Sequence, residues 1–334
     1  MSGKPRILFP LAIDPEALLK FKDPDHKQTH VAAEKLVRAH GILSYGPGDE
    51  QALLAAIAIL TGRPNRLWSA VVEYLAKSRR TNRGRPASLA EFLTGAASAD
   101  DSAELVRLAL VATGAGGQSR KAAQRNLTER VTMPNIDESK AMEQASSIGT
   151  FPKGASRQEV REQLIEPLAS RSRLVRIMDP YVFRSFLKDP KRPPTHVEWL
   201  LHALQESLPE SATISLVGEL ENSWHVRDRE KDEARVGAFL EKKLAARAQP
   251  LEVKVRLVQS ASPRLQNRFL WFDCTDPFDV LHEFAPLGGD PLKDEFRVTR
   301  QEQINFTETA RLANAYESAT QQGMVSVTKQ FPLQ

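Results

Sequence analysis

Acidic and imidazole side chains gather near the start of the chain, at Asp14, Asp23, Asp25, His26 and His30. Carboxylates and imidazoles are ligands of the divalent metals that assist hydrolysis, and His26 and His30 share one helix face if the helix begins early. Alternatively, Asp23 and Asp25 lie in a turn and cap the helix that follows, because acids stabilise a helix N-terminus. This region therefore carries one hypothesis for catalysis, a metal-dependent nuclease site that includes Asp14 at the end of a strand.

A second group with possible binding chemistry is a run of arginines, Arg79, Arg80, Arg83 and Arg85, with no acid between them. Guanidinium groups bind phosphates through paired hydrogen bonds, so the run suits a polyanion such as nucleic acid. The segment is short and polar and ends in Gly and Pro, which predicts an exposed loop after a helix. It contains no aromatic residue, which argues against stacking on single-stranded bases. The alternative is a solvated surface loop with no ligand.

Further along, glycines precede another basic group, in the order Gly114-Ala115-Gly116-Gly117-Gln118-Ser119-Arg120-Lys121, with Arg125 following. Backbone N–H groups of such a segment can hold phosphate at a helix start. The segment lacks the G-x-x-x-x-G-K-[ST] order of a nucleotide-binding loop. We interpret it as a hinge between two helices and expect no cofactor, and we add Arg120, Lys121 and Arg125 to the candidate nucleic-acid-binding residues.

The segment Gln266-Asn267-Arg268-Phe269-Leu270-Trp271-Phe272-Asp273 combines an amide, a cation and an acid on a short apolar strand. It resembles the active-site strand of the phospholipase D family, whose signature is His-x-Lys and, after four further residues, Asp. Arg268 keeps the cation and Asp273 keeps the acid, but Gln266 stands where that family has its nucleophilic His. An amide is too weak a nucleophile to form the covalent phospho-enzyme, so the resemblance implies a degenerate site without catalytic residues.

The elements around this segment fit the same resemblance. A strand expected at 173–178 ends in Asp179-Pro180-Tyr181, a turn common in such domains. The elements expected after it are a helix at 195–207, a strand at 213–217, a charged helix at 229–246, strands at 251–258 and 266–273, and the segment 280–284. We predict a phospholipase D-like α/β domain at 155–334, in which helices flank a mixed sheet.

The first 150 residues are expected to be mainly helical, with a short first strand at 6–13 and a short extended segment at 42–45. Apolar spacing and capping residues predict helices at 28–40, 49–60 and 65–77. The 49–60 helix is apolar nearly all round, which predicts that it is buried. Residues 131–158 are rich in Pro, Ser and Gly, so the connection between domains is placed there. The overall prediction is an α/β protein with domains at 1–150 and 155–334.

Charge and cysteine content limit the class of protein. Lys and Arg number 46 against 42 Asp and Glu, a formal net charge of +4. Residues 1–150 hold 20 of these cations and 16 of these acids, so they account for the whole excess. Cys274 is the single cysteine, which excludes an internal disulfide and fits a reducing cytoplasm. No apolar run has the length needed to span a bilayer, and the N-terminus lacks the pattern of a signal peptide.

Together these features favour binding over catalysis. We expect a cytoplasmic, non-catalytic subunit that binds nucleic acid or other protein subunits and does not enter a membrane. Because relatives with this phospholipase D-like appearance occur in bacterial anti-phage and mobile-element systems, the resemblance implies a role of that kind. The metal-dependent nuclease built on the N-terminal acids and histidines is the alternative.

Overall fold

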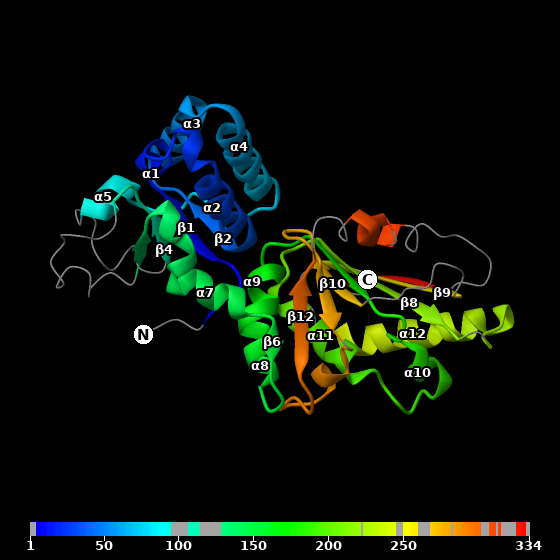
Figure 1. The fold of residues 1–334 in the computed structure, drawn as a ribbon. Helices are drawn as coiled ribbons and strands as arrows, with labels where there is room; N and C mark the ends of the chain where they lie inside the picture. The colour runs from blue at the N-terminus through cyan, green and yellow to red at the C-terminus, as the bar shows by residue number, and fades with distance from the viewer. Residues whose placement is uncertain are drawn as a thin grey trace. The chain divides into compact units, whose positions relative to one another are not determined.

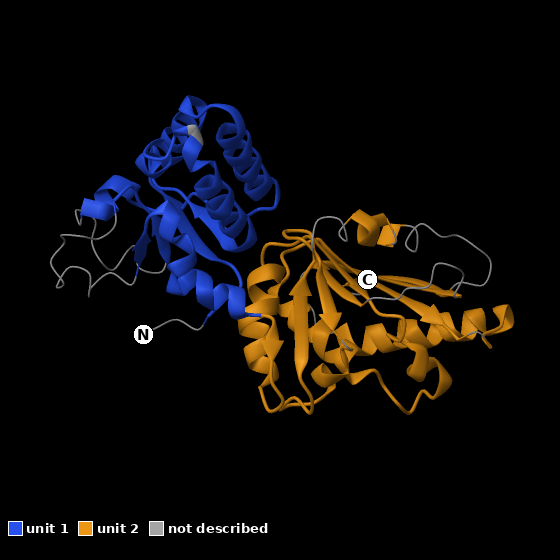
Figure 2. Ribbon diagram, in the orientation of Figure 1, with its two compact units in different colours: residues 1–148 blue, residues 149–334 orange. Residues whose placement is uncertain are grey.

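The chain forms two compact units, Met1–Ile148 and Gly149–Gln334, which Figure 2 colours separately. The domains predicted from the sequence are 1–150 and 155–334. This computed structural model describes residues 5–94, 106–113, 128–221, 223–244, 250–259, 268–281, 283–301, 307–311, 313–314 and 325–331. Each unit contains a β-sheet of its own, so the chain is of the α/β class, as predicted.

A five-stranded parallel sheet organises the N-terminal unit, in the order β3-β2-β1-β4-β5. Its strands are β1 Phe9–Ile13, β2 Gly41–Ser44, β3 Thr81–Asn82, β4 Leu108–Leu110 and β5 Glu129–Val131. Helices hold most of the described residues of this unit, as predicted, but beyond the first strand and the extended segment 42–45 the strands at its centre were not predicted. Parallel strands covered on both faces appear in a sequence as short apolar runs without alternation, and periodicity does not separate such runs from buried helix.

Helices pack on both faces of this sheet. They are α1 Pro15–Leu19, α2 Lys27–His40, α3 Asp49–Ile59, α4 Gly62–Lys77, α5 Leu89–Thr94 and α7 Lys140–Ser147, with 3-10 turns η1 Pro24–His26 and η2 Met133–Glu138. On one face Leu11 of β1 packs in a core with Val37 of α2 and Trp68 of α4. On the other face Ala12 packs with Phe92 of α5. The chain runs from β1 outward to β3 and then returns to β4 beside β1, which is the doubly wound arrangement (Figure 1).

Helix α3 differs from its prediction. Leu53, Ala56 and Ile57 are buried against the core, as a helix of the outer layer requires. Leu54 and Ile59, however, are 48% and 58% exposed. The helix is apolar on both sides but covered on only one, so the prediction that it is fully buried is wrong.

An eight-stranded mixed sheet organises the C-terminal unit, in the order β13-β9-β8-β7-β10-β11-β12-β6. Its strands are β6 Thr150–Phe151, β7 Leu174–Met178, β8 Ala212–Leu220, β9 Leu251–Gln259, β10 Phe269–Phe272, β11 Phe278–Leu281, β12 Phe296–Arg300 and β13 Val325–Phe331. Strands β7, β8 and β9 are parallel to one another, and all other neighbours are antiparallel.

Parallel neighbours need a crossover, and helices supply both crossovers here. Helix α11 Thr195–Ser207 leads from β7 to β8, and α12 Arg229–Leu244 leads from β8 to β9. Both crossovers are right-handed, and each leads to the next strand in the same direction across the sheet. The two helices therefore cover the same face of the sheet. The remaining helical elements are α8 Arg157–Val160, the π-helical η3 Arg161–Ile165, α9 Glu166–Ala169, α10 Arg184–Lys188, η4 Val226–Asp228 and η5 Ala285–Gly288. The order of strands and helices predicted from residue 173 to residue 273 is confirmed, but the short helix α10 was not predicted.

Within the described ranges, no helix combines the length and the apolar character needed to cross a membrane.

Candidate functional site

The predicted degenerate site on β10 does not come together. Arg268 directly precedes β10 and Asp273 directly follows it, so an extended strand separates them by roughly 16 Å. The carboxylate Oδ1 of Asp273 accepts a hydrogen bond from the backbone N–H of Arg173 at 3.0 Å. Gln266 lies outside the described residues. Asp273 therefore has a local structural role at the opposite end of the strand from Arg268, and grouping the two in one site is wrong.

Arg268 instead meets the turn that follows β7. Strands β10 and β7 are antiparallel, with Phe269 opposite Met178, so the next position on each strand brings Arg268 to Asp179. Nε of Arg268 lies 3.4 Å from Oδ1 of Asp179. The guanidinium also lies 5.2 Å from the ring centroid of Tyr181, the last residue of the Asp-Pro-Tyr turn.

Burial governs the electrostatics of this turn. Asp179 is 3% exposed, and desolvation raises the pKa of its carboxyl group above the ordinary value. The backbone N–H of Tyr181, which donates to Oδ1 at 2.9 Å, opposes that rise, as do the charges of Arg268 and Arg184. Arg184 stacks on Tyr181 at 4.8 Å, and its buried Nε forms no hydrogen bond within the part of the chain that the structure describes. The turn thus holds two cations against one aromatic ring.

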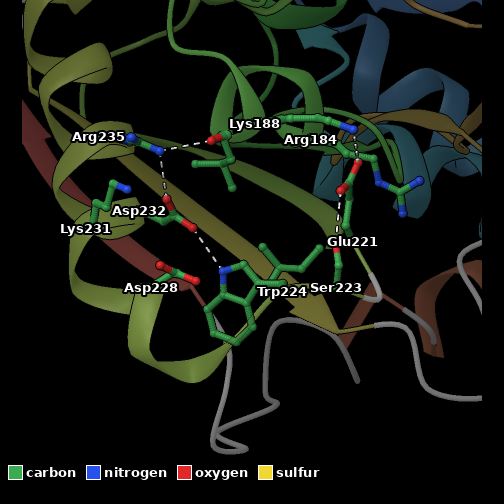
Figure 3. A pocket seen from close by; sticks show the side chains of 11 residues that line it. Arg184, Lys188, Glu221, Ser223, Trp224, Asp228, Lys231, Asp232 and Arg235 are labelled. Atoms are coloured by element: carbon green, nitrogen blue, oxygen red, sulfur yellow. Dashed lines mark hydrogen bonds and ion pairs between the residues drawn. The ribbon is translucent and has the colours of Figure 1, made fainter.

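Arg184 also lines an open cavity of about 280 Å³ at the carboxyl end of β8 (Figure 3). Its walls come from α10, from the loop after β8, from η4 and from the first half of α12. Trp224 projects into this region from the loop, with its indole Nε1 donating to Oδ2 of Asp232 at 3.0 Å. Arg235 donates to the backbone oxygen of Leu187 at 3.0 Å and lies 3.4 Å from Oδ1 of Asp232. Buried Asp232 therefore fixes both the indole and a guanidinium.

Cations outnumber acids in the wall of this cavity. The lining cations are Arg184, Lys188, Lys231 and Arg235, and the lining acids are Glu221, Asp228 and Asp232. The ion pair between Lys188 and Glu221 is loose, at 3.8 Å, and both side chains are partly exposed.

Tyr181 lies at the neighbouring strand end and is 49% exposed. We call Tyr181, Arg184, Lys188, Trp224 and Lys231 the carboxyl-edge site. Ligands of open α/β sheets bind outside the carboxyl ends of the parallel strands, and this site lies at the ends of two of them. The sequence pointed to Tyr181 through its turn, but Trp224 was missed. Its signal was an aromatic residue four positions after the end of an apolar strand and close to basic residues.

The arginine run of the N-terminal unit is not an exposed loop. Strand β3 lies within it and pairs with β2. Arg80 is fully buried, and its Nε and Nη2 donate to the backbone oxygen of Gly41 at 3.0 and 2.7 Å. Arg83 is exposed, but its Nε and Nη2 donate to the two carboxylate oxygens of Glu50, each at 2.7 Å. The predicted exposure is therefore wrong for Arg80, and the charge of Arg83 is already neutralised.

Arg85 is also buried, at 3% exposure, and it pairs with Asp49. Desolvation lowers the pKa of its guanidinium to about 10. The remaining arginine of the run, Arg79, is partly buried and adopts a positive φ of 57°. The second basic group, Arg120, Lys121 and Arg125, lies outside the described residues, as does the glycine segment before it.

The N-terminal acids and histidines do not form a metal site. His30 is buried, its Nδ1 accepts a hydrogen bond from Nε1 of Trp68 at 2.8 Å, and its Nε2 lies 2.8 Å from the backbone oxygen of Phe21. Both ring nitrogens are therefore used inside the fold. Asp14 lies at the end of β1 as expected, but it accepts from the backbone N–H of Glu16 and caps α1.

Among the described residues, which include all five predicted ligands, no group of three or more His, Cys, Asp or Glu side chains could hold a metal ion. The alternative hypothesis of a metal site at Asp14, Asp23, Asp25, His26 and His30 is therefore wrong. Asp14 caps α1 and His30 makes core hydrogen bonds, while no side-chain hydrogen bond caps α2, so the capping role expected for Asp23 and Asp25 is not seen either.

Comparisons with protein families, with curated proteins and with solved structures find no match to this chain, and the phospholipase D resemblance stays a prediction.

Proposed function

We propose that this protein is a non-catalytic, nucleic-acid-binding subunit and that it binds single strands at the carboxyl-edge site. The observation that carries the proposal is the interleaving of aromatic and cationic side chains at the ends of two adjacent parallel strands. Proteins that bind single strands combine cations that contact the backbone with rings on which bases stack. The arginine run predicted from the sequence has no such ring, and most of its cations are engaged within the fold.

Each member of the site has a role in this proposal. Lys188 and Lys231 contact phosphates, because both are exposed and can follow a flexible backbone. Arg184 adds a guanidinium that Tyr181 holds in place through stacking. Trp224 offers a ring whose orientation is set by its hydrogen bond to Asp232, so less conformational entropy is lost when a base stacks on it.

The residues next to this site give a reason to expect no catalysis. An arginine guanidinium remains protonated in proteins and is not a nucleophile, so Arg268 does not replace the family's histidine. Its pairing with Asp179 also withdraws the nearest carboxylate from general-base work. We place this subunit in the cytoplasm, in keeping with its single buried cysteine, and in a bacterial anti-phage or mobile-element assembly, in keeping with the resemblance.

Fluorescence anisotropy of a labelled single-stranded oligonucleotide, measured across a salt series, tests the proposal. Lys188→Ala and Lys231→Ala should each reduce the magnitude of the log–log salt slope by about 0.7. Trp224→Leu should weaken binding by about 1–3 kcal/mol and leave the slope unchanged, while Trp224→Phe, which keeps a ring, should retain most of the affinity. Lys77→Ala is the matched control, because Lys77 is an exposed lysine of the N-terminal unit and pairs with Glu73 one turn earlier in α4.

Equal affinity of the wild type and all carboxyl-edge variants would refute the binding site. Tighter binding of a duplex than of the single strand would refute the stacking mechanism. Cleavage of the oligonucleotide by the full chain, with Mg²⁺ or without it, would refute the non-catalytic assignment.

A further inference from the structure

The cavity at the carboxyl-edge site also contains groups that phosphate binding does not use. Leu187 and Leu220 form an apolar part of its wall, and Trp224 adds an indole ring. Glu221 places a carboxylate beside these apolar groups. Because an acid repels phosphates, its place in this wall indicates a ligand group that donates hydrogen bonds.

Glu221 and Trp224 lie at the two ends of one tight turn. The backbone N–H of Trp224 donates to the backbone oxygen of Glu221 at 2.9 Å, which closes a β-turn. Ser223 lies in the same turn (Figure 3), and its Oγ donates to Oε2 of Glu221 at 3.3 Å. The turn therefore keeps the carboxylate and the indole ring close together in the wall of the cavity.

The carboxylate of Glu221 retains acceptor capacity for a ligand. An ionised carboxylate has about four lone-pair sites on its two oxygens, and Ser223 uses one of them. Nζ of Lys188 lies 3.8 Å from Oε1, beyond the roughly 2.7–3.2 Å of an N–H···O hydrogen bond. The side chain of Glu221 is 38% exposed. Both of its oxygens can therefore accept hydrogen bonds from a ligand in the cavity.

The size of the cavity limits what it can hold. At about 280 Å³ it lies just below the roughly 300–1,000 Å³ of pockets that bind drug-sized molecules. Proteins that recognise single strands turn individual bases outward, stack them on aromatic rings and form hydrogen bonds with their Watson–Crick edges. The cavity suits one such base and not a stack of several.

We infer that the cavity binds one guanine base, with the face of the base on Trp224 and its Watson–Crick edge on Glu221. The assignment rests on the proposed function, because it places a base of the bound strand in the same site. Guanine presents two adjacent donors, N1–H and the N2 amine, which match the two oxygens of a carboxylate. Adenine and cytosine present one donor beside an acceptor nitrogen, and thymine presents one donor between two carbonyl oxygens. Each of these three bases therefore places an acceptor against the second oxygen of the carboxylate.

Cations on two sides of the cavity allow the strand to continue past the bound base. Arg184 and Lys188 come from α10 and Lys231 comes from α12, and Arg184 and Lys231 lie on opposite sides of the view in Figure 3. The phosphates before and after the guanine can therefore contact different cations. These contacts also offset the repulsion between the phosphates and Glu221.

Fluorescence anisotropy of the full chain with oligothymidylates that differ in one central base tests the inference. A central guanine should tighten binding about tenfold relative to thymine, within the range that one bidentate base contact contributes. Hypoxanthine, which lacks the N2 amine, should lose most of this gain, and adenine and cytosine should bind as thymine does. Equal affinity for guanine and hypoxanthine would overturn the inference without any substitution in the protein.

Glu221→Gln tests the carboxylate, because an amide keeps the shape of the side chain but replaces one acceptor by a donor. The variant should lose most of the preference for guanine and bind oligothymidylate as tightly as the wild type or more tightly, since a negative charge near the phosphates is removed. Glu210→Gln is the matched control, because Glu210 is an exposed acid of the same unit outside the cavity wall, and it should keep the preference. A preference that persists in Glu221→Gln, or that is lost in Asp228→Asn instead, would overturn the role of Glu221.

The base assignment and the proposed function fail in different ways. If binding of oligothymidylate does not depend on Lys188 and Lys231, the proposed function is refuted and the base assignment with it. If binding depends on both lysines but a central guanine gives no gain, the base assignment alone is refuted.

Discussion

Replacing Arg80 by alanine should destabilise the N-terminal unit far more than replacing Arg83, three residues away. Arg80 loses two buried side-chain methylenes, worth about 0.8 kcal/mol each, and charge-assisted hydrogen bonds to the oxygen of Gly41, worth about 1.5–3 kcal/mol. Removing the desolvation cost of its guanidinium offsets part of this loss. The expected change is a decrease of about 2–4 kcal/mol in the free energy of unfolding.

Arg83 is the matched control, with the same residue type on the same segment. Its side chain is 61% exposed, and exposed ion pairs contribute about 0.2–1 kcal/mol, so Arg83→Ala should cost less than 1 kcal/mol. Urea denaturation with tryptophan fluorescence measures the difference in a chain whose three tryptophans of the C-terminal unit are replaced by phenylalanine, because Trp68, buried in the core of the N-terminal unit, is then the single emitter. Equal costs for the two variants would refute the buried placement of Arg80.

This comparison also affects how binding data are interpreted. If the run were the exposed loop that the sequence predicts, replacing all four of its arginines would leave folding intact. With Arg80 and Arg85 buried, such a variant should lose structure, so any loss of nucleic-acid binding in it would not identify a contact surface.

Three further predictions follow from named contacts. Trp68→Phe leaves the buried Nδ1 of His30 without its hydrogen-bond donor and should lower the free energy of unfolding by about 1–3 kcal/mol. Mn²⁺, in contrast, should not shift the denaturation midpoint of the wild type. A clear metal-dependent shift would contradict the structural role of His30. Desolvation lowers the pKa of His196 to about 4, below the ordinary 6.5, so its stabilising contribution should be complete above about pH 6.5 and be lost as the pH falls towards 4. Denaturation across this range should show a shallower pH dependence for His196→Gln, and an unchanged dependence would contradict the shift. Gly218→Ala places a Cβ 2.5 Å from Cγ1 of Val182 and 2.9 Å from the backbone oxygen of Asp179, so it should destabilise the C-terminal unit by about 1–3 kcal/mol and weaken binding at the carboxyl-edge site. Gly237→Ala in α12 is its control and should be neutral or stabilising, because only the flexible end of Lys329 is close.

The helices and strands of the C-terminal unit could be predicted from the sequence because each carries a local signal. Helix α11 begins directly after Pro194, and apolar residues repeat along it at helical spacing, so the predicted bounds of 195–207 match the observed ones. Strand β8 is a largely apolar run of nine residues, and in β9, also nine residues long, apolar residues alternate with charged ones. Such signals depend on residues that are near one another in the sequence, so they can be recognised without any knowledge of the fold.

The parts that the sequence did not predict depend on distant partners. The acids that engage Arg83 and Arg85 are 33 and 36 residues earlier in the chain, so counting acids within the arginine run could not reveal them. Strand β4 has only three residues, and it is recognisable as a strand only because β1 and β5 lie on either side of it. The carboxyl-edge site depends on two loops that are brought together by the parallel pairing of β7 and β8.

The position of β13 has a consequence for how the C-terminal unit forms during synthesis. Strand β13 pairs with β9 along seven residues, from Val325 opposite Leu257 to Phe331 opposite Leu251. A ribosome completes β9 well before it reaches β13, so for several seconds the nascent sheet has an unpaired edge at β9. An unpaired edge is a template for pairing with other chains. Expression at high rates should therefore favour aggregation between nascent chains, and chaperones that bind during translation should reduce it.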